Sequence, residues 1–312
     1  MWACDHLHVE FEFQRISVTG TSSSRRRFLK VASRAVAVGA VAVGADATLI
    51  EPNRPRLVRQ EILLRRLPPA FDGFTIIQLS DFHYDPYFSA VPIAAAVRIA
   101  NALKPDLVVL TGDFVSSAII YRSSLLRRAT AHIEPCADIL RGLSAPSGIW
   151  AAFGNHDVYS GPGHIQATLR SAGIQVLCNR AVPIERDGQR FWLAAVGDVL
   201  AGDANLDEAL QGTSSTEAVV LLAHEPDFAD HSARYPVDLQ LSGHSHGGQV
   251  CFPLMGAVYF PRMARKYPRG LRRIGELMLY TNVGIGTLFI PVRWNCPPEV
   301  TLITLRSRQP GS

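Results

Sequence analysis

Residues 74–83 read FTIIQLSDFH, a short apolar run rich in β-branched residues that ends in an Asp-x-His pair. The run Phe74–Leu79 predicts a buried strand, because apolar β-branched and aromatic residues favour strands. Asp81 and His83 follow directly, at the position where open α/β sheets carry their ligand-binding loops. The stretch therefore predicts a strand that delivers two ligand-type side chains to the end of a sheet.

Four more segments place Asp, Asn or His just after an apolar run. They are Gly112-Asp113 after Leu107–Leu110, Gly154-Asn155-His156-Asp157 after Ile149–Phe153, His224 after Val219–Ala223, and Gly243-His244-Ser245-His246 after Leu239–Leu241. Carboxylate, carboxamide and imidazole donors suit first-row divalent ions such as Mn, Fe, Co or Zn. Alternation at a strand end would point both side chains of Asp-x-His or His-x-His the same way. The carboxylate of Asp113 can bridge two ions about 3.5–4 Å apart, and the glycines permit tight turns beside them.

The remaining apolar runs predict the fold class. Strands are expected over 74–79, 107–110, 149–153, 174–177, 191–196, 219–223, 237–241, 277–283 and 300–305. Helical patterns over 91–103, 123–143 and 165–171 separate the early strands, an alternation typical of a sheet covered by helices. The later half is richer in strands. We therefore expect an α/β fold with two sheets packed together and helices outside.

The ordered series D-x-H, G-D, G-N-H-D, H and G-H-x-H resembles that of the calcineurin-like metallophosphoesterases, and it runs from Asp81 to His246. The resemblance implies that family's fold, in which two packed mixed β-sheets are flanked by helices in a four-layer sandwich. Residues 243–250, 280–286, 290–293 and 296–299 are similar to the exported, twin-arginine branch of the family. That branch includes bacterial phosphodiesterases and one class of UDP-2,3-diacylglucosamine hydrolase.

The resemblance also implies a role for each site residue, with two divalent metal ions (Mn, Fe, Zn or Co, Mn favoured). The first ion would be held by Asp81, His83 and His246, the second by Asn155, His224 and His244, and Asp113 would bridge them. His156 would lie near the leaving-group oxygen as a proton or hydrogen-bond donor. Asp157 would orient and charge the His156 imidazole.

The expected function is hydrolysis of a phosphodiester or pyrophosphate bond in a cell-envelope substrate that is lipid-linked or UDP-linked. A phosphomonoesterase, a nucleotide phosphodiesterase and a non-catalytic metal-binding scaffold are the alternatives. Residues 252–270 mix apolar side chains with Arg and Lys. They form either a contact surface for a lipid or glycan phosphate beside the metals, or a pair of core strands whose basic residues face water.

The N-terminal part has the pattern of an export signal. The basic stretch RRRFLK at 25–30 precedes an apolar run over 35–45 and the small residues Ala45-Asp46-Ala47. This predicts a twin-arginine signal peptide over 1–47, read by the twin-arginine translocase. The eleven residues of the run are fewer than the roughly 20 that span a bilayer; retention as an uncleaved membrane anchor is the alternative. We expect a location in the periplasm or on the cell-envelope side of the inner membrane, with association to its surface.

The rest of the chain is expected to be one metallophosphoesterase domain over 71–306, preceded by an extended, proline-containing lead-in over 48–70. Residues 1–66 hold eleven Lys and Arg against six Asp and Glu, which leaves 20 against 21 for the remainder. The basic excess therefore belongs to the N-terminus, and no nucleic-acid partner is indicated. Five cysteines without a C-x-x-C pair predict free, buried thiols and no disulfide framework or zinc ribbon.

Overall fold

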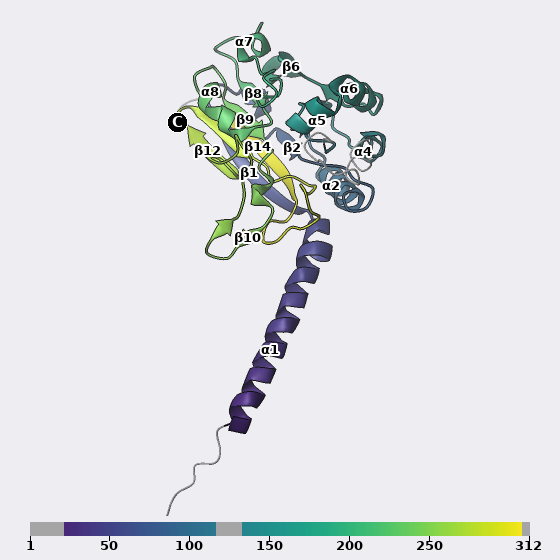
Figure 1. The fold of residues 1–312 in the computed structure, drawn as a ribbon. Helices are drawn as coiled ribbons and strands as arrows, with labels where there is room; N and C mark the ends of the chain where they lie inside the picture. The colour runs from purple at the N-terminus through teal and green to yellow at the C-terminus, as the bar shows by residue number, and fades with distance from the viewer. Residues whose placement is uncertain (1–21, 117–132, 308–312) are drawn as a thin grey trace, which may run out of the picture. The chain divides into compact units, whose positions relative to one another are not determined.

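The structure, a computed structural model, describes residues 22–116 and 133–307. It divides into two compact units, Met1–Ala45 and Asp46–Ser312. The first unit contains α1 (Ser22–Ala45), and the second contains all the strands and the remaining helices (Figure 1).

The apolar helix at the N-terminus is longer than the run over 35–45 suggests. A helix over Ser24–Asn53 is long and apolar enough to cross a membrane, by length and composition alone. Its valines Val36, Val38 and Val41 are exposed. The expectation that this segment is too short to span is therefore wrong, because flanking residues continue the helix beyond the eleven most apolar ones. A signal sequence satisfies the same criterion, so signal and anchor both remain compatible with it.

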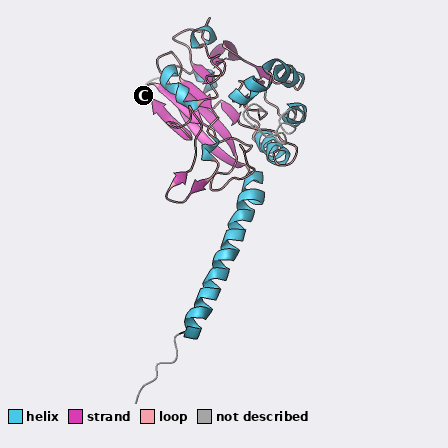
Figure 2. Cartoon of the chain, in the orientation of Figure 1, coloured by secondary structure: helices cyan, strands magenta, loops and turns pink. Residues whose placement is uncertain are grey.

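Two six-stranded mixed sheets form the body of the second unit (Figure 2). The first runs in the order β1 (Arg56–Leu64), β14 (Glu299–Ser307), β2 (Thr75–Leu79), β3 (Leu107–Leu110), β4 (Ile149–Ala151) and β5 (Gln175–Val176). The second runs in the order β12 (Gly270–Ile274), β13 (Leu277–Thr281), β9 (Leu239–Ser242), β8 (Val219–Leu222), β7 (Gln189–Ala195) and β6 (Arg180–Arg186). A separate hairpin pairs β10 (Cys251–Phe252) with β11 (Gly256–Ala257). Strands β2 to β5 are mutually parallel, as are β7, β8, β9 and β13.

Helices cover the outer face of each sheet. They are α2 (Ala90–Ala102), α4 (Ile133–Leu140), α5 (Asn155–Ser160), α6 (Pro162–Ser171), α7 (Leu206–Ala209) and α8 (Ala229–Ser232), with short turns η1 (Asp46–Ile50), η2 (Glu51–Asn53), η3 (Pro69–Phe71), η4 (Pro226–Phe228) and η5 (His246–Gly248). Apolar residues of α2, α4 and α6 pack on the first sheet, and those of α7 and α8 pack on the second. Of the helix predicted over 123–143, residues 133–140 form α4, and 123–132 lie outside the described residues.

The core between the sheets draws on both of them. Phe71, Phe74 and Phe191 pack edge to face there, with ring centroids 4.9–5.5 Å apart. Ile76 of the first sheet and Leu222 of the second belong to the same buried cluster. Helices, sheet, sheet and helices thus form four layers, which confirms the predicted fold class.

One edge of the first sheet comes from the segment expected to be a lead-in. Residues 56–64 form β1, which pairs in parallel with β14 along its whole length. Ile62 and Leu64 are buried between the sheets, although the rest of β1 is partly exposed. The prolines at 52, 55 and 68 flank this strand instead of interrupting it.

The two sheets are joined where β2, β3 and β9 end. The buried Gln78 side chain of β2 donates to Ser242 O of β9 at 2.9 Å and to Thr111 Oγ1, just after β3, at 3.2 Å. Because these strands end at the same place, the loops that follow them from both sheets are brought together.

Arg293 is a fully buried arginine that fixes the loops before β14. Its guanidinium donates to the carbonyl oxygens of Val283, Gly284, Gly286 and Cys296 at 2.6–3.2 Å. We expect Arg293→Met to lower the free energy of unfolding by at least about 3 kcal/mol, because several buried acceptors lose a charged donor. Urea unfolding measures this, with the exposed Arg272→Met as control. Equal stability of the two variants would contradict the assignment.

Candidate metal centre

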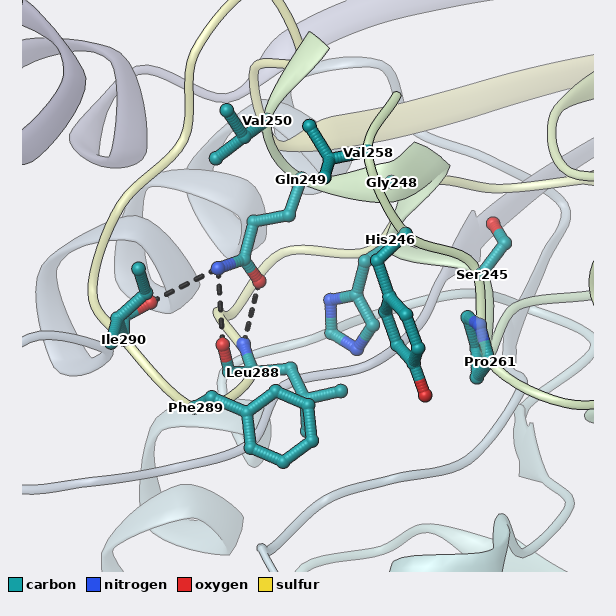
Figure 3. A pocket seen from close by; sticks show the side chains of 11 residues that line it. Ser245, His246, Gly248, Gln249, Val250, Val258, Pro261, Leu288, Phe289 and Ile290 are labelled. Carbon is teal, nitrogen blue, oxygen red and sulfur yellow. Dashed lines mark hydrogen bonds between the residues drawn. The ribbon is translucent and has the colours of Figure 1, made fainter. Parts of the chain in front are cut away.

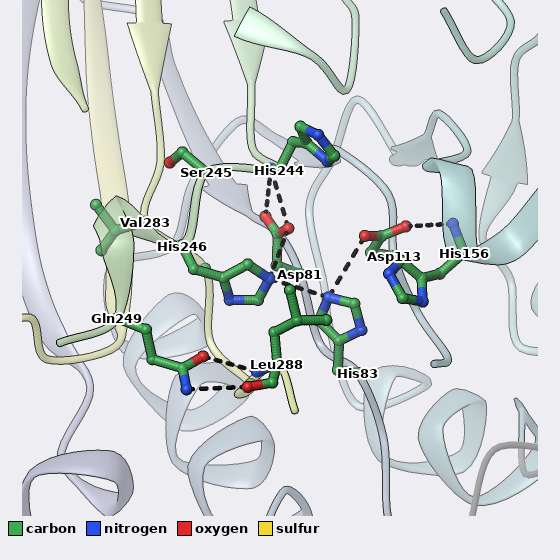
Figure 4. Close-up of polar contacts among 12 residues, drawn as sticks. Asp81, His83, Asp113, His156, His244, Ser245, His246, Gln249, Val283 and Leu288 are labelled. Atoms are coloured by element: carbon green, nitrogen blue, oxygen red, sulfur yellow. Dashed lines mark hydrogen bonds and ion pairs between the residues drawn. The ribbon is translucent and has the colours of Figure 1, made fainter. Parts of the chain in front are cut away.

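The side chains that follow β2, β3 and β9, with one from α5, converge in buried groups (Figure 4), and His224 after β8 belongs to one of these groups. The groups are Asp81, His83 and His246; Asp113, His224 and His244; and His83, Asp113 and His156. Within each group the donor atoms lie within 4.8 Å of one another, and every member is buried. Residues that the sequence separates by more than 160 positions therefore meet at one place.

The first group has the spacing of atoms bound to one ion. His246 Nε2 lies 3.0 Å from His83 Nε2 and 3.4 Å from Asp81 Oδ1. Donor atoms that bind a common first-row ion at about 2.1 Å lie roughly 3.0–3.4 Å apart. His83 Nδ1 lies 3.1 Å from Ser116 Oγ, so the opposite ring nitrogen faces the group.

The second group repeats this spacing with one residue that follows β3 of the first sheet and two that follow β8 and β9 of the second. His224 Nε2 lies 3.1 Å from Asp113 Oδ2 and 3.2 Å from His244 Nδ1. The outer ring nitrogens are occupied, because His224 Nδ1 donates to Thr111 O at 2.6 Å and His244 Nε2 to Arg262 O at 2.9 Å. Such outer hydrogen bonds fix the tautomer and leave the inward nitrogen as a lone-pair donor.

A single oxygen of Asp113 lies between the two groups. Asp113 Oδ2 is 3.1 Å from His224 Nε2 and 3.4 Å from His83 Nε2. Burial by itself would raise the pKa of Asp113, but the imidazoles of His224 and His156 hold it well below its usual value. The carboxylate of Asp113 is therefore ionised, and its Oδ2 faces imidazole nitrogens of both groups.

Asn155 supplies a further donor atom at the start of α5. Its Oδ1 is buried and, among the residues that the structure describes, has no hydrogen-bond partner. A buried acceptor without a donor is unfavourable unless something else satisfies it. Two carboxylates, four imidazoles and this amide oxygen are the donor set that first-row divalent ions prefer. The residues present therefore fit a pair of such ions.

Five of the predicted ligands have a left-handed backbone. The φ angles are 53° at Asp81, 39° at His83, 58° at Asp113, 66° at His244 and 50° at His246. Non-glycine residues rarely adopt this region, and strained backbone of this kind clusters at functional sites. The prediction from strand alternation is thus wrong for the His-x-His pair. The chain turns after β9, so His244 and His246 enter different groups.

Glycines permit the close approach of the loops, as predicted. A Cβ on Gly154 would lie 2.3 Å from Asp113 Oδ1 and 2.7 Å from His224 Nε2. A Cβ on Gly243 would lie 1.9 Å from Ser80 Oγ. Any side chain at these two positions would collide with the metal-centre residues.

His156 lies at the edge of the first group. Its backbone N–H donates to Asp113 Oδ1 at 3.0 Å, and its ring meets the His83 ring edge to face at a centroid distance of 4.7 Å. Burial lowers the pKa of His156, which favours the neutral imidazole.

Asp157 has a different set of partners from the predicted one. Its carboxylate accepts from four backbone amides, those of Asp113 (2.7 Å), Phe114 (2.8 Å), Val115 (3.3 Å) and Gly154 (3.0 Å). Both oxygens accept from two N–H groups each. Asp157 therefore ties the loop after β3, which carries Asp113, to the start of α5.

A buried carboxyl pair beside the centre escaped the sequence analysis. Asp198 and Glu225 are 1% and 0% exposed, and Asp198 Oδ2 and Glu225 Oε1 have no hydrogen-bond partner among the described residues. Burial, with the Asp198 carboxyl nearby, raises the pKa of Glu225 to about 8, which favours its neutral form. Asp198 comes just after β7, as the predicted ligands come just after their strands. This position could have identified Asp198 from the sequence.

An apolar groove of about 490 Å³ adjoins His246 (Figure 3). Val258, Tyr259, Phe289 and Ile290 line it and are each more than half exposed. Gln249 shapes its floor, because its side chain bonds to the backbone of residues 288 and 290 at 2.7–3.0 Å.

Residues 252–270 do not form a pair of core strands. Leu254 and Met255, at the tip of the β10–β11 hairpin, are exposed. The basic residues are divided: Lys266 pairs with Asp230 at 2.7 Å, whereas Arg269 donates inward to Gly247 O. The apolar surface of this segment therefore lies outside, beside the groove.

Cysteines Cys136, Cys178, Cys251 and Cys296 are free, as predicted, although Cys178 is exposed. Cys4 lies outside the described residues.

Comparisons with known proteins point to one family. The family profile of calcineurin-like phosphoesterases matches residues 74–248, more than half of the chain. The uncharacterized metallophosphoesterase YkuE of Bacillus subtilis is 34% identical over 290 residues, covering 91% of this chain and 98% of the relative. Phosphodiesterase YaeI of Escherichia coli K12 is 34% identical over 285 residues, covering 90% and 99%. The UDP-2,3-diacylglucosamine pyrophosphatase LpxG of Chlamydia muridarum is 24% identical over 318 aligned residues, covering 82% and 91%.

The match spans every strand-end segment from Asp81 to His246, and two of these relatives align over nearly their entire length. The chain therefore belongs to the calcineurin-like phosphoesterase family of hydrolases.

Proposed function

We propose that this protein is a dinuclear metal-dependent phosphoesterase that hydrolyses a phosphodiester or pyrophosphate bond of a cell-envelope substrate. The observation that carries the proposal is the position of Asp113 Oδ2, within 3.4 Å of imidazole nitrogens in both groups. Two ions that share this oxygen suit in-line displacement at phosphorus.

Each ion would have its own set of ligands. The first would be held by Asp81, His83 and His246, the second by Asn155, His224 and His244, and both by Asp113. Mn²⁺ is the ion we favour among Mn, Fe, Zn and Co. When bound, such a pair supplies Lewis acidity toward a phosphoryl oxygen and lowers the pKa of a water molecule.

His156 would donate a hydrogen bond or proton to the leaving-group oxygen, with Asp157 positioning the loop of its partner Asp113. We expect His156→Ala to lower turnover roughly 10²–10⁴-fold while the metal content stays at the wild-type value. The measurement pairs elemental analysis with Mn²⁺-supported hydrolysis of a chromogenic phosphodiester. His164→Ala, an exposed histidine paired with Glu134, is the matched control. A parallel loss of metal would reassign His156 as a ligand.

Hydrolysis of phosphodiester, pyrophosphate and phosphomonoester panels by the wild-type protein tests the reaction class. Activity on diesters or pyrophosphates supports the proposal. Activity confined to monoesters or to nucleotide diesters would favour those alternatives, and no metal-dependent hydrolysis would favour a scaffold.

A lipid-linked or UDP-linked substrate is favoured by the groove that adjoins His246. Its lining is almost wholly apolar, and it lies in the size range of small-molecule sites, roughly 300–1,000 Å³. The alkyl part of a substrate whose phosphoester lies at the metals would reach this groove. The name of the relative LpxG, a UDP-2,3-diacylglucosamine pyrophosphatase, agrees with such a substrate.

Ile290→Asn tests the groove. We expect a KM about 10-fold higher for UDP-2,3-diacylglucosamine, because an apolar side chain that contacts an acyl chain contributes 1 kcal/mol or more. Hydrolysis of a small chromogenic diester should stay within about twofold of wild type. Leu63→Asn on β1 replaces a side chain of the same exposure, 56%, remote from the groove. An unchanged KM would argue against an acyl chain at this position.

We further propose export by the twin-arginine route, with the protein held at the outer face of the inner membrane. The pair Arg25-Arg26 ahead of the apolar helix supports this. Replacing both arginines with lysine should retain the protein in the cytoplasm, which fractionation of cells measures.

A further inference from the structure

Two buried thiols lie against the loop that carries His246. Cys251, the first residue of β10, donates to Gly247 O at 3.4 Å, and Cys296 donates to the same oxygen at 3.7 Å. The two side chains also belong to one buried cluster with Val283. A shared carbonyl oxygen and a common cluster hold the two sulfur atoms side by side, at 7% and 3% residue exposure.

The backbone holds the two segments in register. The Cys251 N–H donates to Trp294 O at 2.9 Å, and Asn295 Nδ2 donates to Cys251 O at 3.1 Å. A parallel bridge pairs Val250 with Trp294. Disulfides form only where the chain already brings two cysteines close, and this pairing places Cys251 and Cys296 on adjacent segments.

Arg269 lies beside one of the thiols. Its Nη2 lies 2.9 Å from Cys251 Sγ. The neighbouring Cys296 thiol, helped by Arg269, lowers the pKa of Cys251 to about 6. The thiolate is the nucleophile in thiol–disulfide exchange.

We propose that Cys251 and Cys296 form a reversible disulfide, with a small disulfide such as glutathione disulfide as oxidant, and that its formation weakens metal binding at His246. The Cys251 thiolate attacks one sulfur of the oxidant, breaks its S–S bond and releases one thiolate. Cys296 then attacks Cys251 Sγ in the mixed disulfide and releases the second. The oxidant takes up two electrons, and the two cysteine protons end on the two released thiols.

The link to the metal centre is the loss of the Cys296 S–H. In the reduced protein this thiol lies 3.3 Å from His246 O and 3.7 Å from Gly247 O, so its one proton is shared by the two carbonyls of the turn that carries His246. A disulfide has no S–H, and the two carbonyls lose this donor. Loss of a partner that orients a ligand typically lowers metal affinity 10–100-fold. The proposed export takes the chain to a compartment where disulfides persist.

The pairing is tested on the purified full chain in detergent. The protein is equilibrated with mixtures of reduced and oxidised glutathione and alkylated with N-ethylmaleimide. The cysteine peptides are then identified by mass. We expect Cys251 and Cys296 to lose their reactivity together and to form one linked peptide. Cys136→Ser and Cys178→Ser should leave this result unchanged, whereas Cys251→Ser should leave Cys296 open to alkylation after unfolding. Two thiols that stay alkylatable at saturating oxidant, or that pair with other cysteines, would overturn the site.

The second readout is Mn²⁺ binding by equilibrium dialysis. We expect the oxidised chain to bind Mn²⁺ about 10-fold more weakly than the reduced chain, with no such difference in Cys251→Ser. Pairing without this difference would overturn the link to His246. Neither readout depends on catalysis, so a failure of the proposed hydrolase activity would not be mistaken for a failure here.

Discussion

Asp113→Asn is expected to abolish detectable phosphodiester hydrolysis and to reduce the metal content to less than half of the wild-type value. The shared oxygen Asp113 Oδ2 lies between His83 and His224, so neutralising this carboxylate weakens both proposed ions at once. The loss in turnover should therefore exceed the roughly 10²–10⁴-fold that a single acid–base group contributes. Elemental analysis and Mn²⁺-dependent hydrolysis measure the two effects.

Asp138→Asn is the matched control, since Asp138 is an exposed residue of α4 that pairs with Arg141. It should retain wild-type metal content and hydrolysis. An Asp113→Asn protein that still bound two ions per chain would remove Asp113 from the bridging position and with it the basis of the dinuclear proposal.

Asp157→Asn is expected to destabilise the fold by about 2–6 kcal/mol. Each carboxylate oxygen of Asp157 accepts from two backbone amides, Asp113 and Gly154 on one side and Phe114 and Val115 on the other. An amide side chain has one oxygen, so in either orientation its NH₂ group faces two N–H donors that then lack an acceptor. Urea unfolding measures the loss, and reduced metal content should accompany it because Asp113 is no longer fixed.

Asp72→Asn separates this effect from the simple loss of a carboxylate. Asp72 Oδ1 accepts from one amide, that of Ser307, at 2.9 Å, and an asparagine can keep that bond through its own oxygen. Its cost should be below about 1 kcal/mol. If Asp157→Asn were no more harmful than Asp72→Asn, the four amides would not depend on the carboxyl group of Asp157.

The strands that carry the site were predictable because each is buried on both faces. β2, β3, β8 and β9 are short apolar runs, and such runs leave a clear signal in the sequence. Apart from the short hairpin strands β10 and β11, the missed strands β1, β6 and β12 lie at sheet edges and expose most of their side chains. An edge strand needs few apolar residues, so its pairing with a distant neighbour leaves little trace in its own composition.

Local sequence also misjudged what surrounds the ligands. It assigned Asp157 to its neighbour His156, but the partners of Asp157 are mainly the backbone amides of residues 113–115. It found no relation between Cys251 and Cys296, whose thiols meet only because β10 returns beside residues 294–296. Contacts of this kind join segments far apart along the chain, and no periodicity encodes them.

The sequence by itself determined the fold class, the family and the donor types, because burial periodicity and the order of Asp, Asn and His after strands are local properties of the chain. The resemblance implied which donors share an ion, but the tertiary structure decided how they meet: left-handed turns separate His244 from His246, one oxygen of Asp113 lies between the two groups, and an apolar groove opens beside His246. The physical reason is that these relations depend on how two sheets pack and on left-handed turns after the strands, and both are set by long-range contacts.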